Sequence, residues 1–513
     1  MTKVLKAGGL WLVITVVVWL ITIWRWQNTG HDVSTGDIVG QLFVLPTLLA
    51  GVLWLALWGV KRLREQTGMP VPSAPIQPAG DMAVAPQQDE ALRQASAWVM
   101  AEAVTLSAGL DATTAWSSIR EQRVRPALDS HLQDVDGMPV FTSRVADLDL
   151  QDWLDAHAEL TDGSGGSLSE PVLRGLALLE GPLNQMLGAI GELVPAESVR
   201  AQPHDLAPAG NDRAMKAHLS GVASPVSPAQ ARSREALAPQ LTIRLLLPVH
   251  WPEPERARAI DWLRSQCGGL LDWVEATQAR GLQWVTAPLT QPEALWDEVD
   301  QHMLMWSRQA RPELLLILAV DGAVHAADID RMQAVGELFT AAHQTGKVPG
   351  EGSVGLLLAN DKWPGLGQRE ALPVRMWRPV RTRRDKSADA AGRVGTTALG
   401  AALEHAYGLS QADTDGLLVV SDADHRASRT GELFEALQAV LPGLDPMLAV
   451  TRVGEACGEL GLARALAPTA LACTALRASD ALRQAALVAH VQSSHERVVV
   501  ALAPWLQPQA LAA

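Results

Sequence analysis

Two long uncharged apolar runs near the start of the chain restrict its fold more than any other feature. Residues 7–24 and residues 38–60 contain no charged side chain. Each run is close to the roughly 20 residues that cross the hydrocarbon core of a bilayer. Residues 1–66 are therefore expected to form a two-span membrane hairpin that contacts the lipid bilayer through residues 7–60. A cleaved signal peptide is the alternative for the first run, but no small-residue cleavage site follows it.

The charges that flank the two runs predict the orientation of the hairpin. Lys3 and Lys6 precede the first run, and Lys61, Arg62 and Arg64 follow the second. Because cationic residues remain on the cytoplasmic side of a membrane, both termini are expected in the cytoplasm. The large region after the hairpin is then cytoplasmic as well.

The composition excludes several classes of function. The net charge is −14, and no long Lys/Arg patch occurs outside the membrane flank. Nucleic acid is therefore not expected as a partner, because phosphate binding needs clustered cations. The three cysteines form no CxxC motif and have no Cys/His ligand spacing. Neither a disulfide framework nor a structural zinc site is expected.

Beyond the hairpin, changes in composition divide the chain into segments. Residues 67–88 hold five prolines and are expected to form an extended tether. A first α/β half is expected over 89–363, with a flexible insertion at 196–240, and a second α/β half over 364–505.

Short apolar runs alternate with helical patterns through both halves. This alternation is typical of an α/β protein with a largely parallel sheet covered on both faces. The predicted strands are 139–145, 241–249, 313–320, 353–359, 416–420 and 446–453, and the predicted helices are 152–158, 169–190, 254–266, 291–308, 326–345, 396–406, 430–441 and 457–488.

The order of these elements resembles that of thiolase-fold ketosynthases. The stretch "ELLLILAVDGAVHAADIDRMQAVGELFTAAHQTGKVPGEGSVGLLLAN" (313–359) is similar to the strand, turn, helix and glycine turn in the middle of that family. "GLLVVSDADHRASRTGELFEALQAVL" (416–441) and "LAVTRVGEACGELGLARALAPTALA" (448–472) resemble its two later strand–loop–helix units. The resemblance implies a thiolase-like α/β region.

The residues that ketosynthase chemistry needs are missing. That chemistry uses a cysteine nucleophile at a strand-to-helix turn and two histidines. The turn would fall near Thr286–Pro292, where there is no cysteine, and Glu455 stands where the second family histidine would fall. His425 lies near the first. Cys457 is either a nucleophile with His425 or His490 as its base, or a small buried packing residue. The resemblance itself implies no catalytic residue.

A second resemblance covers nearly the whole chain. The hairpin with "WRWQNTGHDVSTGDIVGQLFVLP", the tether, "HLQDVDGMPVFTSRVADLD" (131–149) and the thiolase-like tail resemble the type VI secretion lipase-adaptor family. This resemblance implies a non-enzymatic adaptor at the bacterial inner membrane. Its implied partners are a phospholipase effector and a component of the secretion spike.

Four residues are candidates for binding a ligand. Asp422, Asp424 and His425 follow a predicted strand, where α/β proteins place ligands. They predict either a metal or acid–base site, or aspartates that cap the following turn. Glu455 is the fourth candidate, from its place in the resemblance. No cofactor is implied, and no metal ion is assigned to these residues.

Three functional hypotheses follow from the sequence. The first is the membrane-tethered, thiolase-like pseudoenzyme acting as an adaptor. The second is a thiolase-fold acyltransferase or condensing enzyme at the inner membrane, with Cys267 or Cys457 as its nucleophile. The third is a structural subunit of an envelope machine, held through the hairpin itself.

Overall fold

The computed structural model describes Trp19 and residues 95–160, 168–193, 238–368, 371–478 and 484–505. The predicted spans, the tether and nearly all of the predicted insertion at 196–240 lie outside these residues. Gln240, the last residue of that predicted insertion, already belongs to a strand. In the part of the chain that is described, none of the helices combines the length and the apolar character needed to span a membrane.

Most strands of the compact unit Ala85–Ala513 belong to one 11-stranded sheet. Its order is β11-β10-β12-β13-β8-β1-β7-β6-β4-β5, and β9 pairs with β13 outside this path. The bounds of these strands are β1 Ser96–Leu106, β4 Gln240–Leu246, β5 Leu282–Val285, β6 Glu313–Gly322, β7 Glu351–Ala359, β8 Val374–Trp377, β9 Val380–Arg383, β10 Leu417–Ser421, β11 Val450–Arg452, β12 Ala485–His490 and β13 Glu496–Pro504. A separate hairpin consists of β2 (Ala127–Gln133) and β3 (Pro139–Thr142).

The sheet contains the same five-strand pattern twice. In the first half the strands lie in the order β1-β7-β6-β4-β5, and in the second half in the order β8-β13-β12-β10-β11. Numbered along the chain within each half, both orders read 1-5-4-2-3. In both halves the fifth strand runs antiparallel to its two neighbours, and the other pairs are parallel. The described region is therefore a duplicated, mixed α/β fold.

The prediction of a largely parallel sheet is wrong, because many of the strand pairs are antiparallel. Strands β7 and β13 are antiparallel to both neighbours, and β1 is antiparallel to β8. Every residue of β7 is buried. An antiparallel strand covered on both faces has the same continuous apolar run as a parallel one, so composition does not distinguish them.

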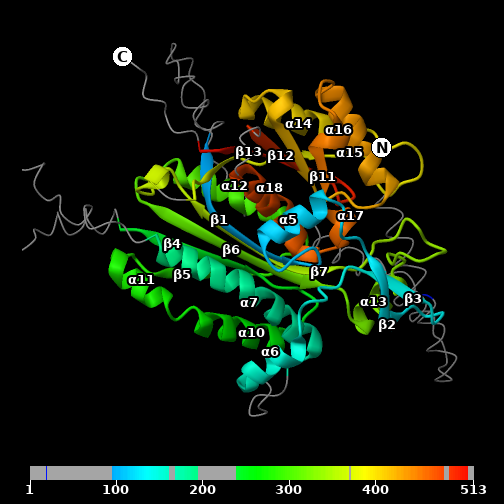
Figure 1. The fold of residues 1–513 in the computed structure, drawn as a ribbon, viewed down its shortest axis with the longest axis horizontal. Coiled ribbons are helices and arrows are strands. Elements are labelled where there is room, and N and C mark those ends of the chain that lie inside the picture. Colours follow the sequence, from blue (N-terminus) through cyan, green and yellow to red (C-terminus); the bar gives the residue numbers. More distant parts are fainter. Residues whose placement is uncertain are drawn as a thin grey trace, which may run out of the picture. The chain divides into compact units, whose positions relative to one another are not determined.

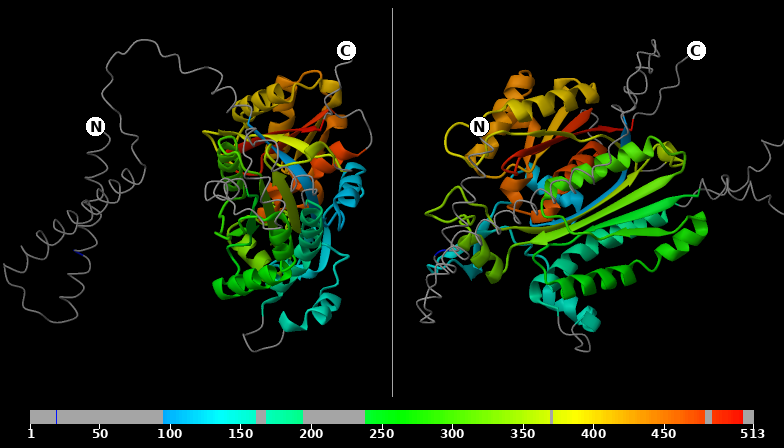
Figure 2. Two further views of the ribbon diagram at one scale, coloured as in Figure 1. Left: turned by 90° about the vertical axis from the view of Figure 1, so that its left-hand side faces the viewer. Right: turned by 180° about the vertical axis from the view of Figure 1, so that it is seen from behind.

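Helices cover both halves and fill the space between them (Figures 1 and 2). The helix α7 packs on β1, β6 and β7, and α10 and α11 pack on α7. On the other side of β1 lie α5 and α18, and α18 also contacts β10, β12 and β13. The bounds of the helices are α5 Ala112–Arg120, α6 Leu150–Ala156, α7 Glu170–Gly191, α10 Glu253–Gln266, α11 Leu270–Thr277, α12 Leu295–Trp306, α13 Ala326–Ala334, α14 Thr397–Ser410, α15 Ala427–Val440, α16 Pro446–Ala449, α17 Val453–Cys457 and α18 Ala467–Arg477.

Three of the four hydrophobic clusters among the described residues follow from this layering, and the fourth lies around the β2-β3 hairpin and α13. The largest lies between the halves and contains α18 with the apolar face of α12. A second lies between the first half and α7, and a third between the second half and α14 and α15. Because α18 is buried on nearly all sides, its alanines let the two halves of the sheet approach it closely.

Three predicted elements differ from the structure for identifiable reasons. The predicted helix 457–488 includes β12, whose sequence AALVAH has high helix propensity but is buried between two strands. The predicted helix 326–345 ends at Ala334, and Gly336 follows in the left-handed conformation that ends helices. In the predicted strand 446–453, Asp445 caps a helical turn, and only Val450–Arg452 pair with β10.

Candidate functional site

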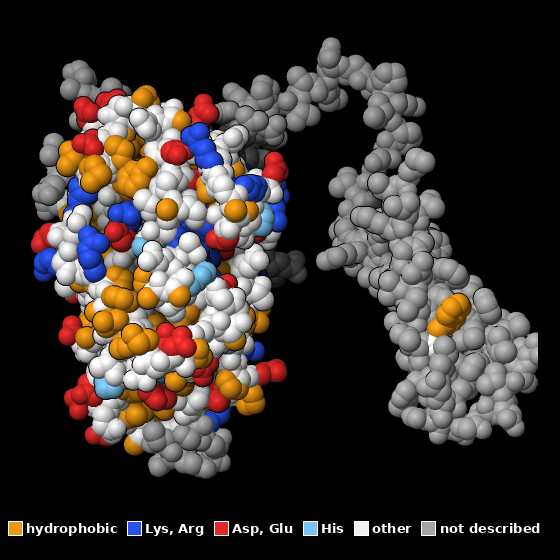
Figure 3. Space-filling model, turned by 90° about the vertical axis from the view of Figure 1, so that its right-hand side faces the viewer, with side chains coloured by type: hydrophobic (Ala, Val, Ile, Leu, Met, Phe, Trp, Pro, Cys, Tyr) orange, Lys and Arg blue, Asp and Glu red, His pale blue; other side chains and the backbone are white. Residues whose placement is uncertain are grey.

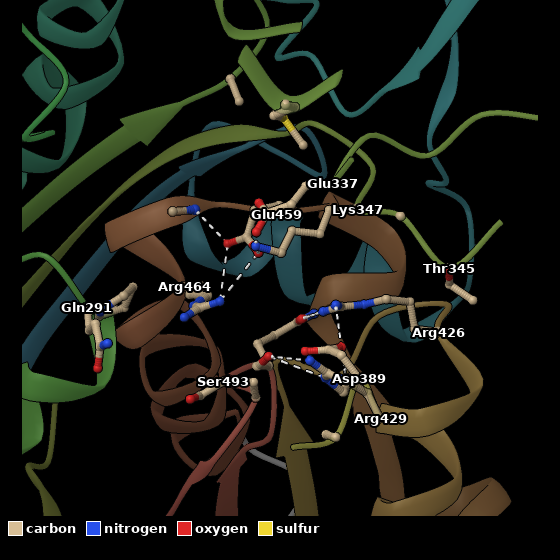
Figure 4. A pocket seen from close by; sticks show the side chains of 18 of the residues that line it. Gln291, Glu337, Thr345, Lys347, Asp389, Arg426, Arg429, Glu459, Arg464 and Ser493 are labelled. Atoms are coloured by element: carbon tan, nitrogen blue, oxygen red, sulfur yellow. Dashed lines mark hydrogen bonds and ion pairs between the residues drawn. The ribbon is translucent and has the colours of Figure 1, made fainter. Parts of the chain in front are cut away.

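A cavity of about 950 Å³ lies at the ends of strands from both halves. Asp321 and Gly322 reach it from the end of β6, and Gln492–Ser494 reach it from the turn between β12 and β13. Arg426 lies immediately before α15, and Arg464 lies in the 3-10 helix η7 (Gly461–Ala465). Figure 4 shows Arg464 beside Glu459 and Arg426 beside Asp389. The cavity therefore joins loops that are far apart in the sequence.

The turn where a ketosynthase nucleophile was expected does reach this cavity. Of the segment Thr286–Pro292, the cavity is lined by Leu289, Thr290, Gln291 and Pro292, and none of these side chains can act as a thiolate. The next residue, Glu293, starts the 3-10 helix η4 with Pro292 and is buried. At the place where a nucleophile was expected, the cavity wall therefore holds the carboxylate of Glu293.

All three cysteines lie away from the cavity wall and are buried. Burial raises the pKa of the Cys267 thiol to about 11. Burial also raises the pKa of the Cys457 thiol to about 11, although the nearby Ser107 and Ala108 backbone act to lower it. The pKa of the Cys473 thiol is raised for the same reason. A nucleophilic cysteine needs a lowered pKa and access to substrate, and these thiols have neither.

Asp422 and Asp424 follow β10 and are both buried. Asp424 accepts hydrogen bonds from the backbone N–H of Arg426 at 3.0 Å and from the Arg426 Nε at 2.7 Å. Asp422 accepts from the Val491 N–H at 2.7 Å, and its Oδ2 lies 3.5 Å from the His490 Nδ1. Burial by itself raises the pKa of Asp422, but the hydrogen bond and charge of His490 hold it below its usual value.

The other two candidates lie elsewhere. The His425 ring packs edge-on against Phe339, with 4.9 Å between ring centroids, and does not line the cavity. Glu455 pairs with Arg452 and, at 3.1 Å, with Arg125, on a separate groove of about 290 Å³. The four candidates thus form no single site. Within the described ranges, no group of three or more His, Cys, Asp and Glu side chains is arranged to hold a metal ion.

Ion pairs that the sequence did not single out make up the cavity wall. Arg464 contacts Glu293 at 2.7 Å and Glu459 at 3.3 Å, and Lys347 contacts Glu337 at 3.0 Å. Burial alone would lower the pKa of Arg464, but Glu459 and Glu293 raise it above its ordinary value. In Figure 4, Glu459 lies between Lys347 and Arg464. Cations and anions are similarly interspersed on the face of the molecule in Figure 3.

The turn at Asp321 packs closely against Gly461 of the second half, where a larger residue would not fit. Asp321 accepts hydrogen bonds from the N–H groups of Leu462 and Gly322, each at 2.9 Å. A Cβ atom at Gly461 would lie 2.1 Å from the Asp321 Oδ2, and Gly461 has a φ of +52°. Burial raises the pKa of Asp321 to about 6. The carboxyl at the end of β6 is therefore fixed by contacts between the halves.

A sequence signal for the arginines existed but was weak. Arg426 and Arg429 stand in the quoted stretch "SDADHRASR", three residues apart at the start of a helix. Most arginines at helix starts are solvated, so their burial could not be inferred from spacing. Their acidic partner, Asp389, lies in another segment altogether.

No family model and no curated protein matches this chain. Among solved structures, it is similar to the ishigamide ketosynthase/chain length factor, with 14% identity, a TM-score of 0.46, and coverage of 80% of this chain and 99% of the other. An oxazolomycin ketosynthase domain of Streptomyces albus matches with 13% identity, a TM-score of 0.46, and coverage of 80% and 74%. For the ketosynthase of bacillaene synthase module 1 from Bacillus amyloliquefaciens, the values are 11%, 0.42, 81% and 77%.

The thiolase-like character of the fold follows from the repeated strand order described above. The expected α/β, thiolase-like region is thus confirmed for the described residues, with a mixed sheet in place of the expected largely parallel one. The predicted membrane hairpin and the lipase-adaptor family remain predictions.

Proposed function

We propose that this chain is a membrane-anchored, non-catalytic adaptor with a thiolase-like fold. In this proposal it binds a phospholipase-type effector in the cytoplasm and assists the loading of that effector for type VI secretion. The observation that carries the non-catalytic part is the turn 286–292, which lines the cavity without a thiol. The partner and the inner-membrane anchor come from the sequence resemblance.

The electrostatics of the cavity support binding rather than covalent chemistry. A nucleophile has to be activated by a base or by a lowered pKa. Burial instead raises the pKa of Cys267 and Cys457 to about 11. The charged side chains of the wall are paired with one another, as Arg464 is with Glu293 and Glu459. Such paired groups form a fixed pattern of charge that a partner can recognise.

Co-purification tests the adaptor proposal directly. The full chain, solubilised in detergent, is mixed with a phospholipase-type effector of a type VI secretion system, and complex formation is measured by size-exclusion chromatography. A stable complex is expected with the effector and none with an unrelated secreted lipase. A well-folded chain that captures no effector would refute the proposal.

Replacement of the hairpin separates the adaptor from a structural subunit of an envelope machine. Residues 1–66 are exchanged for an unrelated two-span anchor, and secretion of the effector is measured. An adaptor that acts through its cytoplasmic region keeps its function. A subunit held in place through its own hairpin loses function although the chain stays in the membrane.

The alternative function is that of a thiolase-fold acyltransferase or condensing enzyme. Two observations favour it: the duplicated thiolase-like strand order and the cavity of about 950 Å³ at the strand ends. By fold alone this alternative is better supported than the adaptor. It predicts consumption of acyl-carrier or acyl-CoA thioesters, acylation of Cys267 or Cys457, and loss of turnover in C267A or C457A. Intact thioesters and no acylated cysteine by mass spectrometry would exclude it.

A further inference from the structure

Two buried arginines on the cavity wall share a carboxylate that comes from the surface. The side chains of Arg426 and Arg429 are 6% and 1% exposed, whereas that of Asp389 is 51% exposed. The Asp389 Oδ1 lies 2.6 Å from the Arg429 Nη1 and 3.6 Å from the Arg426 Nη1. Figure 4 shows Asp389 beside both arginines. A half-exposed carboxylate thus neutralises cations that are almost fully desolvated.

The two arginines differ in their other partners. Arg426 has a second carboxylate, the buried Asp424 at 2.7 Å, and it also donates to the Gln492 side chain. Arg429 donates to the Gln492 backbone carbonyl at 3.1 Å and to Ser428 at 2.9 Å. Among the described residues, Asp389 is the one acidic side chain in ion-pair contact with Arg429. Without Asp389, a buried guanidinium would have neutral partners only.

Asp389 stands on a segment outside the regular elements. It follows β9 and precedes α14, and its backbone N–H donates to the Ser387 Oγ at 3.1 Å. Burial by itself raises the pKa of the Asp389 carboxyl, but Arg429 and Arg426 hold it below its usual value. An exposed carboxylate is readily rehydrated, whereas a buried arginine is not. Exchange of this carboxylate for another therefore costs much less than opening the site to water.

We propose that Arg426 and Arg429 form a carboxylate-binding site in the cavity wall. Asp389 occupies this site in the free protein, and a carboxylate from an acidic peptide segment of a partner protein takes its place in the complex. The inference deepens the proposed adaptor function and rests on it for the identity of the partner.

The size and lining of the cavity favour a peptide over a small carboxylate. About 950 Å³ is near the upper end of the roughly 300–1,000 Å³ of small-molecule sites, so one carboxylate fills little of it. Gln291, Thr345 and Ser493 line the same cavity and add hydrogen-bonding side chains around it (Figure 4). The site also lies at the N-terminal end of the 14-residue helix α15, where the helix dipole favours an anion.

Chemical rescue tests whether the carboxylate is exchangeable. The probe is acetate, compared with chloride at the same ionic strength, and the readout is the thermal unfolding midpoint of the full chain in detergent. Asp389→Ala is expected to lower the midpoint by about 2–4 °C, and acetate is expected to restore it. Asp389→Asn keeps the shape of the side chain and is expected to show the same rescue. Asp385→Ala, an exposed acid on the same segment, is the matched control and is expected to show no rescue.

Peptide binding tests the source of the carboxylate. A fluorescent glutamate-containing peptide with blocked termini is titrated into wild type and Asp389→Ala. Because Asp389 competes for the site, the variant is expected to bind the peptide about tenfold or more tightly than wild type. The peptide is also expected to bind more tightly than free acetate. If acetate binds as tightly as the peptide does for each carboxylate, the proposal that the carboxylate comes from a peptide is wrong. If inorganic phosphate restores the unfolding midpoint more strongly than acetate, the proposal that the ligand is a carboxylate is wrong.

The remaining outcomes separate this inference from the adaptor function. Absence of acetate rescue, or equal rescue by chloride or in Asp385→Ala, overturns the carboxylate site. If the chain captures the lipase while no carboxylate binds, only this inference fails. If the peptide binds as expected while no effector is captured, the site stands and the adaptor proposal fails.

Discussion

The ion pairs around Arg464 lead to a quantitative prediction for Arg464→Met. Methionine keeps much of the side-chain volume but removes the cation that faces Glu293 at 2.7 Å and Glu459 at 3.3 Å. Both carboxylates are largely buried, as is the guanidinium. Removal of one partner from a buried ionic group typically costs about 3–5 kcal/mol. We expect the free energy of unfolding to fall by about this amount at pH 7.

The loss should depend on pH in a defined direction. Burial alone would raise the pKa of Glu459, but Arg464 and Lys347 hold it below the ordinary value of 4.5. In wild type, this carboxylate therefore contributes stability above pH 4.5 and loses it as the pH falls through its folded pKa. Without Arg464 the pKa rises, so the folded variant accepts the proton more readily. The difference between wild type and variant should shrink as the pH falls from 7 to 4.5.

Urea unfolding of the full chain, followed by tryptophan fluorescence, measures this difference. Arg264→Met is the control, because Arg264 and Asp261 form a solvent-exposed pair at 3.3 Å. Such surface pairs are worth about 0–1 kcal/mol. A loss below about 1 kcal/mol for Arg464→Met, or a loss that is the same at pH 7 and pH 4.5, would refute the reasoning.

Three further predictions concern the cysteines, a close backbone contact and the carboxyl at the end of β6. The three buried thiols are expected to resist alkylation at pH 8 in the folded protein and to react after denaturation; mass spectrometry would reveal any rapid native labelling, which contradicts this. Gly454→Ala places a Cβ atom 2.1 Å from the Asp422 carbonyl oxygen and is expected to cost about 1–3 kcal/mol in urea unfolding, whereas Gly431→Ala, with nothing within 4 Å, should cost nothing. Burial raises the pKa of Asp321 to about 6 from 3.8, so this group opposes folding increasingly as the pH rises between these values. Asp321→Asn should gain stability relative to wild type on going from pH 4 to pH 7, and a thermal unfolding difference that is the same at both pH values would contradict this.

Part of the fold was predictable because buried strands leave continuous apolar runs in the sequence and buried helices leave apolar residues at helical spacing. The predicted strands at 241–249, 313–320 and 353–359 correspond to β4, β6 and β7, and the predicted helix 169–190 corresponds to α7. Strand direction was not predictable, since covered antiparallel and parallel strands have the same composition. The strand β12 was missed because alanine favours helices, and only its neighbours β10 and β13 override that preference.

The sequence by itself determined the α/β class, from local pattern, and the lack of a cysteine at the turn 286–292, from residue type. The thiolase-like order of the elements came from the family resemblance. Tertiary structure alone decided which charges meet. Asp389 joins Arg429, and Glu293 joins Arg464, across separations of 40 and 171 residues. An ion pair depends on the distance between two side chains and on their burial. For residues so far apart in the sequence, a single sequence contains no pattern from which either could be predicted. The sequence pointed to Asp422, Asp424, His425 and Glu455 as site residues. In the structure, the candidate site is instead a cavity wall where Arg429 and Arg464 pair with carboxylates from distant segments of the chain.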